Sequence, residues 1–104
     1  MLYIKMYDTE KGSIIAMCDE RLLGKKYTDR KSGARLDLDK YSDFYKGDLV
    51  DTEDAKGRIM RENIYSANIV GKESVSLMVK LGLAGEDDVK TVDSIPSLQI
   101  YRVL

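Results

Sequence analysis

The sequence predicts an α+β fold, in which a mostly antiparallel sheet carries about two helices packed on one face. Three observations support this prediction. Strand-like patterns lie toward the two ends of the chain, helical patterns lie between them, and glycines stand where elements should end. The length of 104 residues is typical of one domain, so residues 1–104 are expected to form a single globular domain.

The first two strands are the clearest predicted elements. Aliphatic residues alternate with tyrosine and lysine over 2–7, which is the period of a strand. Residues 13–18 are almost all apolar, as in a central strand that is buried on both faces. The polar segment 8–12 ends in a glycine, so the two strands are expected to form a β-hairpin.

The next part of the chain predicts shorter elements. Residues 19–23 are expected to form one helical turn that ends at Gly24. Two further strands are expected over 25–28 and 34–39, with a polar turn between them. Residues 41–48 are expected to form an aromatic-rich loop.

Two helices are predicted in the second half of the chain. The first begins at Asp51 or Thr52, either of which can cap it, and ends near Asn63. The second covers 72–81, where apolar residues recur with helical spacing, and Gly82 ends it.

The remaining segments complete the predicted order of elements. Residues 67–71 are expected to be a turn that leads into the second helix. Strands are expected over 89–92 and 98–103, with Pro96 at the start of the second, where its missing N–H costs little.

Charge and cysteine content limit the class of protein. The 17 Lys and Arg residues nearly balance the 18 Asp and Glu residues. This balance argues against a polyanion-binding surface over the whole protein but allows a local basic patch. The single cysteine cannot form an internal disulfide, which indicates the reducing cytoplasm. Because no apolar stretch approaches the roughly 20 residues of a membrane span, no membrane partner is expected.

The residue types that are missing exclude several chemistries. The chain has no histidine, which rules out Ser-His-Asp and Cys-His catalysis as normally built, and a tetrahedral zinc site. Neither a P-loop nor a dinucleotide fingerprint is present. We therefore expect no cofactor and no bound metal, and any enzyme would have to use carboxylates, lysines, tyrosines or the lone cysteine.

The strongest candidate binding site is the predicted start of the second helix, at Asn68, Gly71 and Lys72. A glycine there would let a ligand approach the backbone, and the free N–H groups and the helix dipole favour an anion such as phosphate. Lys72 would add a positive charge. The alternative is an ordinary turn before a helix, with Lys72 in solvent.

A second candidate site is the aromatic segment with Tyr41, Phe44 and Tyr45 beside Lys46. Aromatic rings interleaved with lysines are typical of single-stranded nucleic-acid binding, because bases stack on the rings and phosphates contact the lysines. The alternative is that these rings cover an open edge of the core.

Cys18, Asp19 and Glu20 form a third candidate site. A reactive cysteine needs nearby positive charge, and the two carboxylates that follow Cys18 disfavour its thiolate, so a structural thiol is the main interpretation. Asp37 and Asp39 share one face of a predicted strand and could act as paired carboxylates, although such residues more often line a solvated face.

Three stretches, 14–25, 44–50 and 67–83, resemble in the same order an archaeal family of small proteins known as domain of unknown function 424. The tail 95–100 also resembles the end of that family. Family members commonly have a histidine after the proline, whereas this chain has Ser97, so a role for that imidazole does not transfer. The resemblance implies an archaeal cytoplasmic protein without an assigned activity, loosely associated with translation genes and RNA.

Taken together, the residues and the resemblance predict a non-catalytic binding protein that contacts RNA or a translation-related ribonucleoprotein. A protein-interaction adaptor or a homodimer is the alternative, formed through an edge strand such as 98–103. A third hypothesis is an enzyme that uses Cys18 or the carboxylates.

Overall fold

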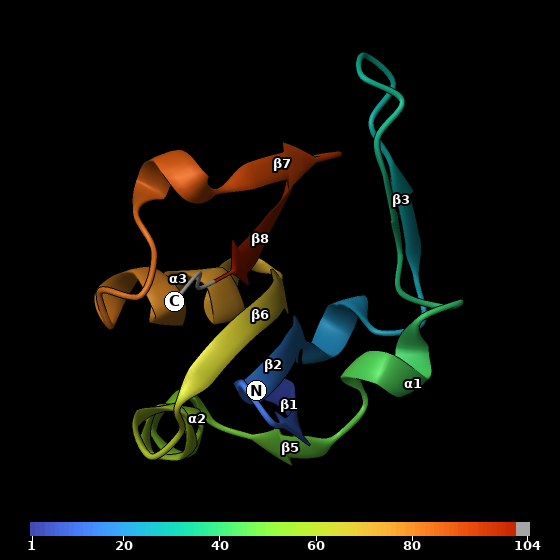
Figure 1. Ribbon diagram of the computed structural model, residues 1–104. Coiled ribbons are helices and arrows are strands. Elements are labelled where there is room, and N and C mark those ends of the chain that lie inside the picture. Colours follow the sequence, from blue (N-terminus) through green and yellow to red (C-terminus); the bar gives the residue numbers. More distant parts are fainter. Residues whose placement is uncertain (102–104) are drawn as a thin grey trace.

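The computed structural model describes residues 1–101 and is built around a six-stranded sheet (Figure 1). The strand order is β5-β1-β2-β6-β8-β7, and every neighbouring pair is antiparallel except β2 and β6, which are parallel. The six strands are β1 (Leu2–Thr9), β2 (Gly12–Asp19), β5 (Asp48–Val50), β6 (Ile64–Val70), β7 (Lys90–Val92) and β8 (Ile95–Tyr101). A separate antiparallel pair consists of β3 (Lys26–Thr28) and β4 (Arg35–Asp37).

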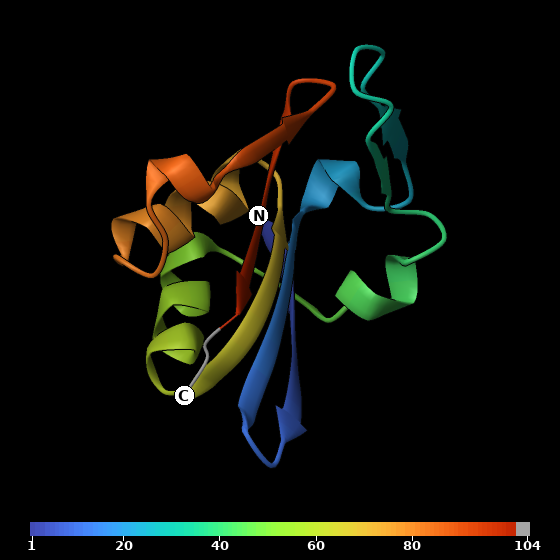
Figure 2. The same ribbon diagram turned by 45° about the horizontal axis from the view of Figure 1, so that its top comes forward.

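Helices lie on both faces of this sheet (Figure 2). The two long helices, α2 (Thr52–Met60) and α3 (Lys72–Lys80), lie on one side. The short helix α1 (Ser42–Tyr45), the 3₁₀ turn η1 (Glu20–Leu22) and the β3–β4 hairpin lie on the other. A second 3₁₀ turn, η2 (Glu86–Asp88), precedes β7. Within residues 1–101, no helix is long and apolar enough to cross a membrane.

The predicted fold class is therefore confirmed in part. The protein is α+β and its large sheet is mostly antiparallel, as expected. The helices are not all packed on one face, and the parallel β2–β6 pair was not expected. A parallel pair needs a long connection between its strands, and here η1, β3, β4, α1, β5 and α2 all lie between β2 and β6 in the sequence.

The main core lies between the sheet and the two long helices. Ile15 and Met17 of β2 and Ile69 of β6 belong to it, because alternate residues of a strand point to the same face. Ala55 of α2 and the fully buried Met78 of α3 pack into the same cluster.

A smaller core lies on the opposite face of the sheet. Its buried members are Cys18, Leu38 and Val70, and half-buried residues such as Leu36 and Tyr45 pack around them. Through this cluster, the base of the β3–β4 hairpin and α1 pack against the sheet.

The segment 67–71 corrects the sequence-based prediction of a turn. It is the end of the central strand β6, which pairs with β2 on one side and β8 on the other. Its asparagine and glycine are typical of turns, but Ala67, Ile69 and Val70 are buried between neighbouring strands. Only Gly71 leaves the strand conformation, with φ of +109°.

The expected loop 41–48 also has more structure than predicted. It contains α1, and Asp48 begins the short strand β5, which pairs with β1 at the edge of the sheet. Three residues are too few for an alternating pattern to identify a strand, so this edge depends on the pairing with β1.

Several local predictions are confirmed. The side chain of Asp51 caps α2 by accepting a hydrogen bond of 2.8 Å from the backbone N–H of Asp54. The end of α3 is a Schellman motif, in which the N–H of Gly82 donates to the carbonyl of Val79 and the N–H of Leu83 donates to the carbonyl of Met78.

The last predicted strand starts earlier than expected, at Ile95, and residues 102–103 of the prediction lie outside the described residues. Only the second part of this strand is at an edge of the sheet, because β7 pairs with Ile95–Ser97 on the side away from β6.

Candidate functional site

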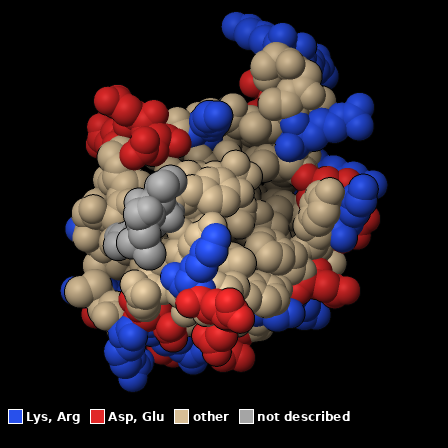
Figure 3. Space-filling view, in the orientation of Figure 1, with Lys and Arg blue, Asp and Glu red and all other residues tan. Residues whose placement is uncertain are grey.

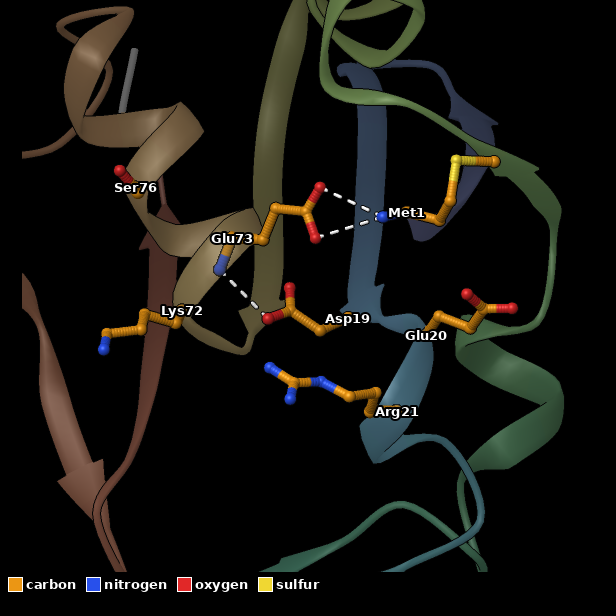
Figure 4. Close-up of a pocket in the computed structure, with 7 residues that line it drawn as sticks. All are labelled: Met1, Asp19, Glu20, Arg21, Lys72, Glu73 and Ser76. Atoms are coloured by element: carbon orange, nitrogen blue, oxygen red, sulfur yellow. Dashed lines mark hydrogen bonds and ion pairs between the residues drawn. The ribbon is translucent and has the colours of Figure 1, made fainter.

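The N-terminus of α3 is bound by a side chain of the protein itself, Asp19 (Figure 4). Its Oδ2 accepts the backbone N–H of Glu73 at 3.0 Å, and its Oδ1 accepts the backbone N–H of Ser74 at 2.8 Å and the Ser74 hydroxyl at 2.7 Å. Both Asp19 and Ser74 are buried. A carboxylate at the positive end of a helix is favourable, so Asp19 occupies the position that the sequence suggested for an external anion.

The parallel pairing of β2 and β6 explains why these residues meet. Cys18 is the register partner of Val70, so the next residues, Asp19 and Gly71, leave the same edge of the sheet together. A Cβ atom on Gly71 would overlap the carboxylate of Asp19, and the φ of +109° is one that other residues rarely adopt. The glycine is therefore required for the approach of Asp19.

A pocket of about 480 Å³ lies beside this helix start (Figure 4). The amino group of Met1 lies 3.2 Å from both carboxylate oxygens of Glu73. Three positive groups (Met1, Arg21, Lys72) and three negative groups (Asp19, Glu20, Glu73) line the pocket, together with Ser76. The pocket therefore has no excess of positive charge for a phosphate.

Cys18 directly precedes Asp19 in the sequence and is fully buried. Its Sγ lies 3.4 Å from the carbonyl oxygen of Asp19, to which the thiol donates. Burial, and to a smaller extent the charge of Asp19, raises the pKa of the Cys18 thiol to about 12. The group is a protonated thiol at neutral pH, which favours the structural interpretation of this cysteine.

The aromatic segment packs mainly against the sheet. The ring of Phe44 is stacked on that of Tyr7, with centroids 5.2 Å apart, and contacts Tyr45 edge-on at 5.1 Å. Burial, and to a smaller extent the electrostatic effect of Cys18, raises the pKa of the Tyr45 hydroxyl to about 12. Tyr41 differs from the other two rings because it is 53% exposed, and Lys46 is exposed at the end of α1. The geometry favours the alternative in which Phe44 and Tyr45 cover the core.

The carboxylate of Asp37 is used in a turn. Its Oδ1 accepts the backbone N–H of Lys40 at 2.8 Å and that of Asp39 at 3.2 Å. The hydrogen bond from Lys40 is the main reason why the pKa of Asp37 is lowered. Asp37 therefore orders the chain after β4.

A larger hollow, of about 700 Å³, lies between the β3–β4 hairpin and the sheet, and we call it the hairpin groove. Two of the predicted site residues, Asn68 and Tyr45, line it. Its other lining residues come from the hairpin, from β6, β7 and β8, and from η2, and are Asp29, Ser32, Ala34, Arg35, Leu36, Ile69, Val70, Asp88, Lys90, Thr91, Val92, Ser97, Leu98, Gln99 and Tyr101.

Strand register places two amide side chains on the floor of the hairpin groove. Asn68 of β6 is the direct partner of Gln99 of β8, and Ser66 is the partner of Tyr101. These residues alternate with Ile69 and Leu98, which belong to the main core on the other face. The two amide side chains therefore lie side by side on the face that bounds the groove.

The hairpin beside the groove concentrates positive charge. Residues 25–35 contain one acidic residue, Asp29, and five exposed basic residues: Lys25, Lys26, Arg30, Lys31 and Arg35. This segment has a net charge of +4, although the whole chain has −1. Within residues 1–101, the one ion pair of these basic side chains joins Lys26 to Asp39 at 3.9 Å. Figure 3 shows the basic side chains of the hairpin at the upper right of the molecule.

The structure thus brings some of the predicted site residues together in two places. Asp19, Glu20, Gly71 and Lys72 meet at the start of α3, and Asn68 and Tyr45 lie in the hairpin groove. The remaining ones, Cys18, Tyr41, Phe44 and Lys46, line neither hollow.

Sequence reasoning missed the hairpin as a candidate site. The closely spaced basic residues of 25–35 indicate a positive patch, but the sequence-based prediction assigned their central part only to a polar turn. Gln99 and Tyr101 gave no such signal, because the face they occupy depends on the pairing of β8 with β6.

We expect Asp19→Ala to lower the free energy of unfolding by about 1–3 kcal/mol, because the buried Ser74 hydroxyl and two N–H groups lose their acceptor. Gly71→Ala should cost about 1–3 kcal/mol through backbone strain and overlap with Asp19. Urea denaturation measures both effects, with the exposed Glu20→Ala as the matched control. The double variant should lose less than the sum, because the overlap disappears with Asp19. Strict additivity would contradict this coupling.

We expect the Cys18 thiol to be unreactive in the native protein, because it is buried and protonated at neutral pH. A chromogenic disulfide reagent should modify it only at the rate of unfolding, and rapidly in denaturant. Modification in native buffer as fast as that of free cysteine would show instead an accessible thiolate.

Comparisons with known proteins agree with this fold. The crystal structure of an uncharacterized conserved protein from Methanopyrus kandleri is similar, with a TM-score of 0.77 and 26% sequence identity, covering 96% of this chain and 90% of that one. A search of curated proteins finds no match. The family model described as a protein of unknown function (DUF424) matches residues 7–103. Because this match extends over almost the whole chain, the protein belongs to DUF424, the family that its sequence resembles.

Proposed function

We propose that this protein is a non-catalytic RNA-binding protein, acting on free RNA or on RNA within a ribonucleoprotein, and that the β3–β4 hairpin makes its main electrostatic contact. The observation that carries the proposal is the charge of the hairpin. Residues 25–35 have a net charge of +4 and all five of their basic side chains are exposed, so the other residues together have −5. A separated positive patch attracts a polyanion even when the whole protein is slightly acidic.

The position of the hairpin supports the same proposal. It projects from the body of the protein and forms its own two-stranded sheet (Figures 1 and 2). Its base is held by Leu38, which is buried and exchanges backbone hydrogen bonds with Gly24 and Lys25, each 2.8 Å long. The tip is therefore free to contact a partner while the base stays attached to the smaller core.

The α3 start contributes less to this proposal than the sequence suggested. The N–H groups of Glu73 and Ser74 already donate to Asp19, so they are not available to a phosphate. Lys72 is exposed and retains its side-chain charge for a peripheral contact. The proposed main contact therefore moves from Lys72 to the hairpin.

The double variant Arg30→Ala/Lys31→Ala tests the hairpin contact. It should weaken binding to a labelled single-stranded RNA and reduce the salt dependence of log K by about 0.7 for each phosphate contact that is lost. Fluorescence anisotropy across a salt series measures both. The matched control is Lys56→Ala/Lys80→Ala, which removes the same charge from exposed positions on α2 and α3. Equal losses in the two variants would contradict a specific contact at the hairpin.

A second candidate function, self-association or protein binding, is favoured by one feature of β8. The short strand β7 pairs only with Ile95–Ser97, so the outer edge of residues 98–101 has no partner strand among the described residues. An open edge can pair with another chain. If it does so with a second copy, sedimentation velocity should show a dimer that grows with concentration. A monomer at every concentration would rule out the homodimer.

A further inference from the structure

We infer that the RNA is recognised as a single strand, whose bases enter the hairpin groove while its phosphates contact the basic hairpin. This inference rests on the proposed function and names the form of RNA that the site would take. Its starting point is the difference between the groove, whose lining includes neutral amide side chains, and the outer surface of the hairpin beside it, which carries the positive charge.

The floor of the groove offers hydrogen-bonding groups without a protein partner. Asn68 and Gln99 are direct register partners on one face of the sheet, so their Cβ atoms are about 5 Å apart. Within residues 1–101, neither amide side chain forms a hydrogen bond to another protein group. Amides can both donate to and accept from the edges of unpaired bases.

An aromatic ring stands at the edge of the same floor. Tyr101 lines the groove on the strand that carries Gln99, and it is 68% exposed. An exposed tyrosine offers a face on which a base can stack, and stacking is how proteins hold single-stranded nucleic acid with little demand for a particular sequence. Phe44 and Tyr45 do not offer this in the same way, because their rings contact each other and Phe44 is stacked on Tyr7.

The distribution of charge sets the orientation of the strand. The charged residues that line the groove balance, since Asp29 and Asp88 are offset by Arg35 and Lys90. The excess of positive charge belongs to the hairpin, where Lys31 and Arg30 are exposed near the turn. A groove without net charge beside a positive hairpin fits bases that point inward and a phosphate backbone that follows the outer surface of the hairpin.

The size of the groove excludes a double helix. Its volume of about 700 Å³ lies in the range of sites for small organic ligands, which is enough for about one or two bases. In duplex RNA the bases are paired and stacked inside the helix, and its deep major groove is too narrow for side chains to read. A duplex could touch the hairpin but could not place its bases against Asn68 and Gln99.

The test compares single-stranded and duplex RNA of the same sequence by fluorescence anisotropy, using the full chain. The wild-type protein should bind the single strand at least about tenfold more tightly. Gln99→Ala and Tyr101→Ala should each weaken single-strand binding, Tyr101→Ala by roughly five- to a hundredfold, and should leave the salt dependence unchanged. Matched controls outside the groove are Asn63→Ala for the amide and Met60→Ala for an exposed large side chain.

The outcomes separate this inference from the proposed function. If the hairpin variant Arg30→Ala/Lys31→Ala loses binding but Gln99→Ala and Tyr101→Ala bind as the wild type does, the groove is not the base site and only the general RNA contact stands. Equal affinity for duplex and single strand also overturns the inference. If the wild-type protein binds neither RNA even at low salt, the proposed function fails with it. Gln99 and Tyr101 are exposed, so their variants should melt close to the wild-type temperature, which circular dichroism checks.

Discussion

The contact between Asp19 and the start of α3 joins the two halves of this protein. Asp19 is the last residue of β2. The N–H groups that donate hydrogen bonds to it belong to Glu73 and Ser74, which follow it by 54 and 55 positions in the chain. The parallel pairing of β2 and β6 brings both strand ends to one edge of the sheet, and Gly71 leaves room there for the carboxylate. Because α3 begins at this contact, the position of the helix over the main core depends on it.

The alternation of side chains along the central strands gives the sheet two different faces. One face is apolar and carries the main core with α2 and α3. The other is covered in part by the smaller core around Cys18 and Leu38, and the part beside it is polar where Asn68 and Gln99 pair. The groove is lined in part by core residues such as Val70, but the amide side chains of Asn68 and Gln99 belong to neither core cluster.

The β3–β4 hairpin shows how a small element can carry charge without a core of its own. A lone two-stranded hairpin is marginally stable in water. Here Leu38 holds the base of the hairpin in the smaller core, with Leu36 and Tyr27 packed beside it. The exposed side chains of the hairpin are not needed for this packing, so they can be basic. The same arrangement explains why a nearly neutral protein can present a strongly positive patch.

The sequence by itself determined the elements whose signals are local. The β1–β2 hairpin, the Asp51 cap of α2 and the glycine end of α3 each depend on residues within a few positions of one another, and each was predicted. The family was also readable from short segments in their order. Tertiary structure decided the rest. Strand β6 was mistaken for a turn because its asparagine and glycine have local turn preferences, which burial between β2 and β8 overrides. Likewise, the partner of the α3 start and the amide pair in the hairpin groove depend on which distant strands pair and in which register, and no local pattern encodes that choice.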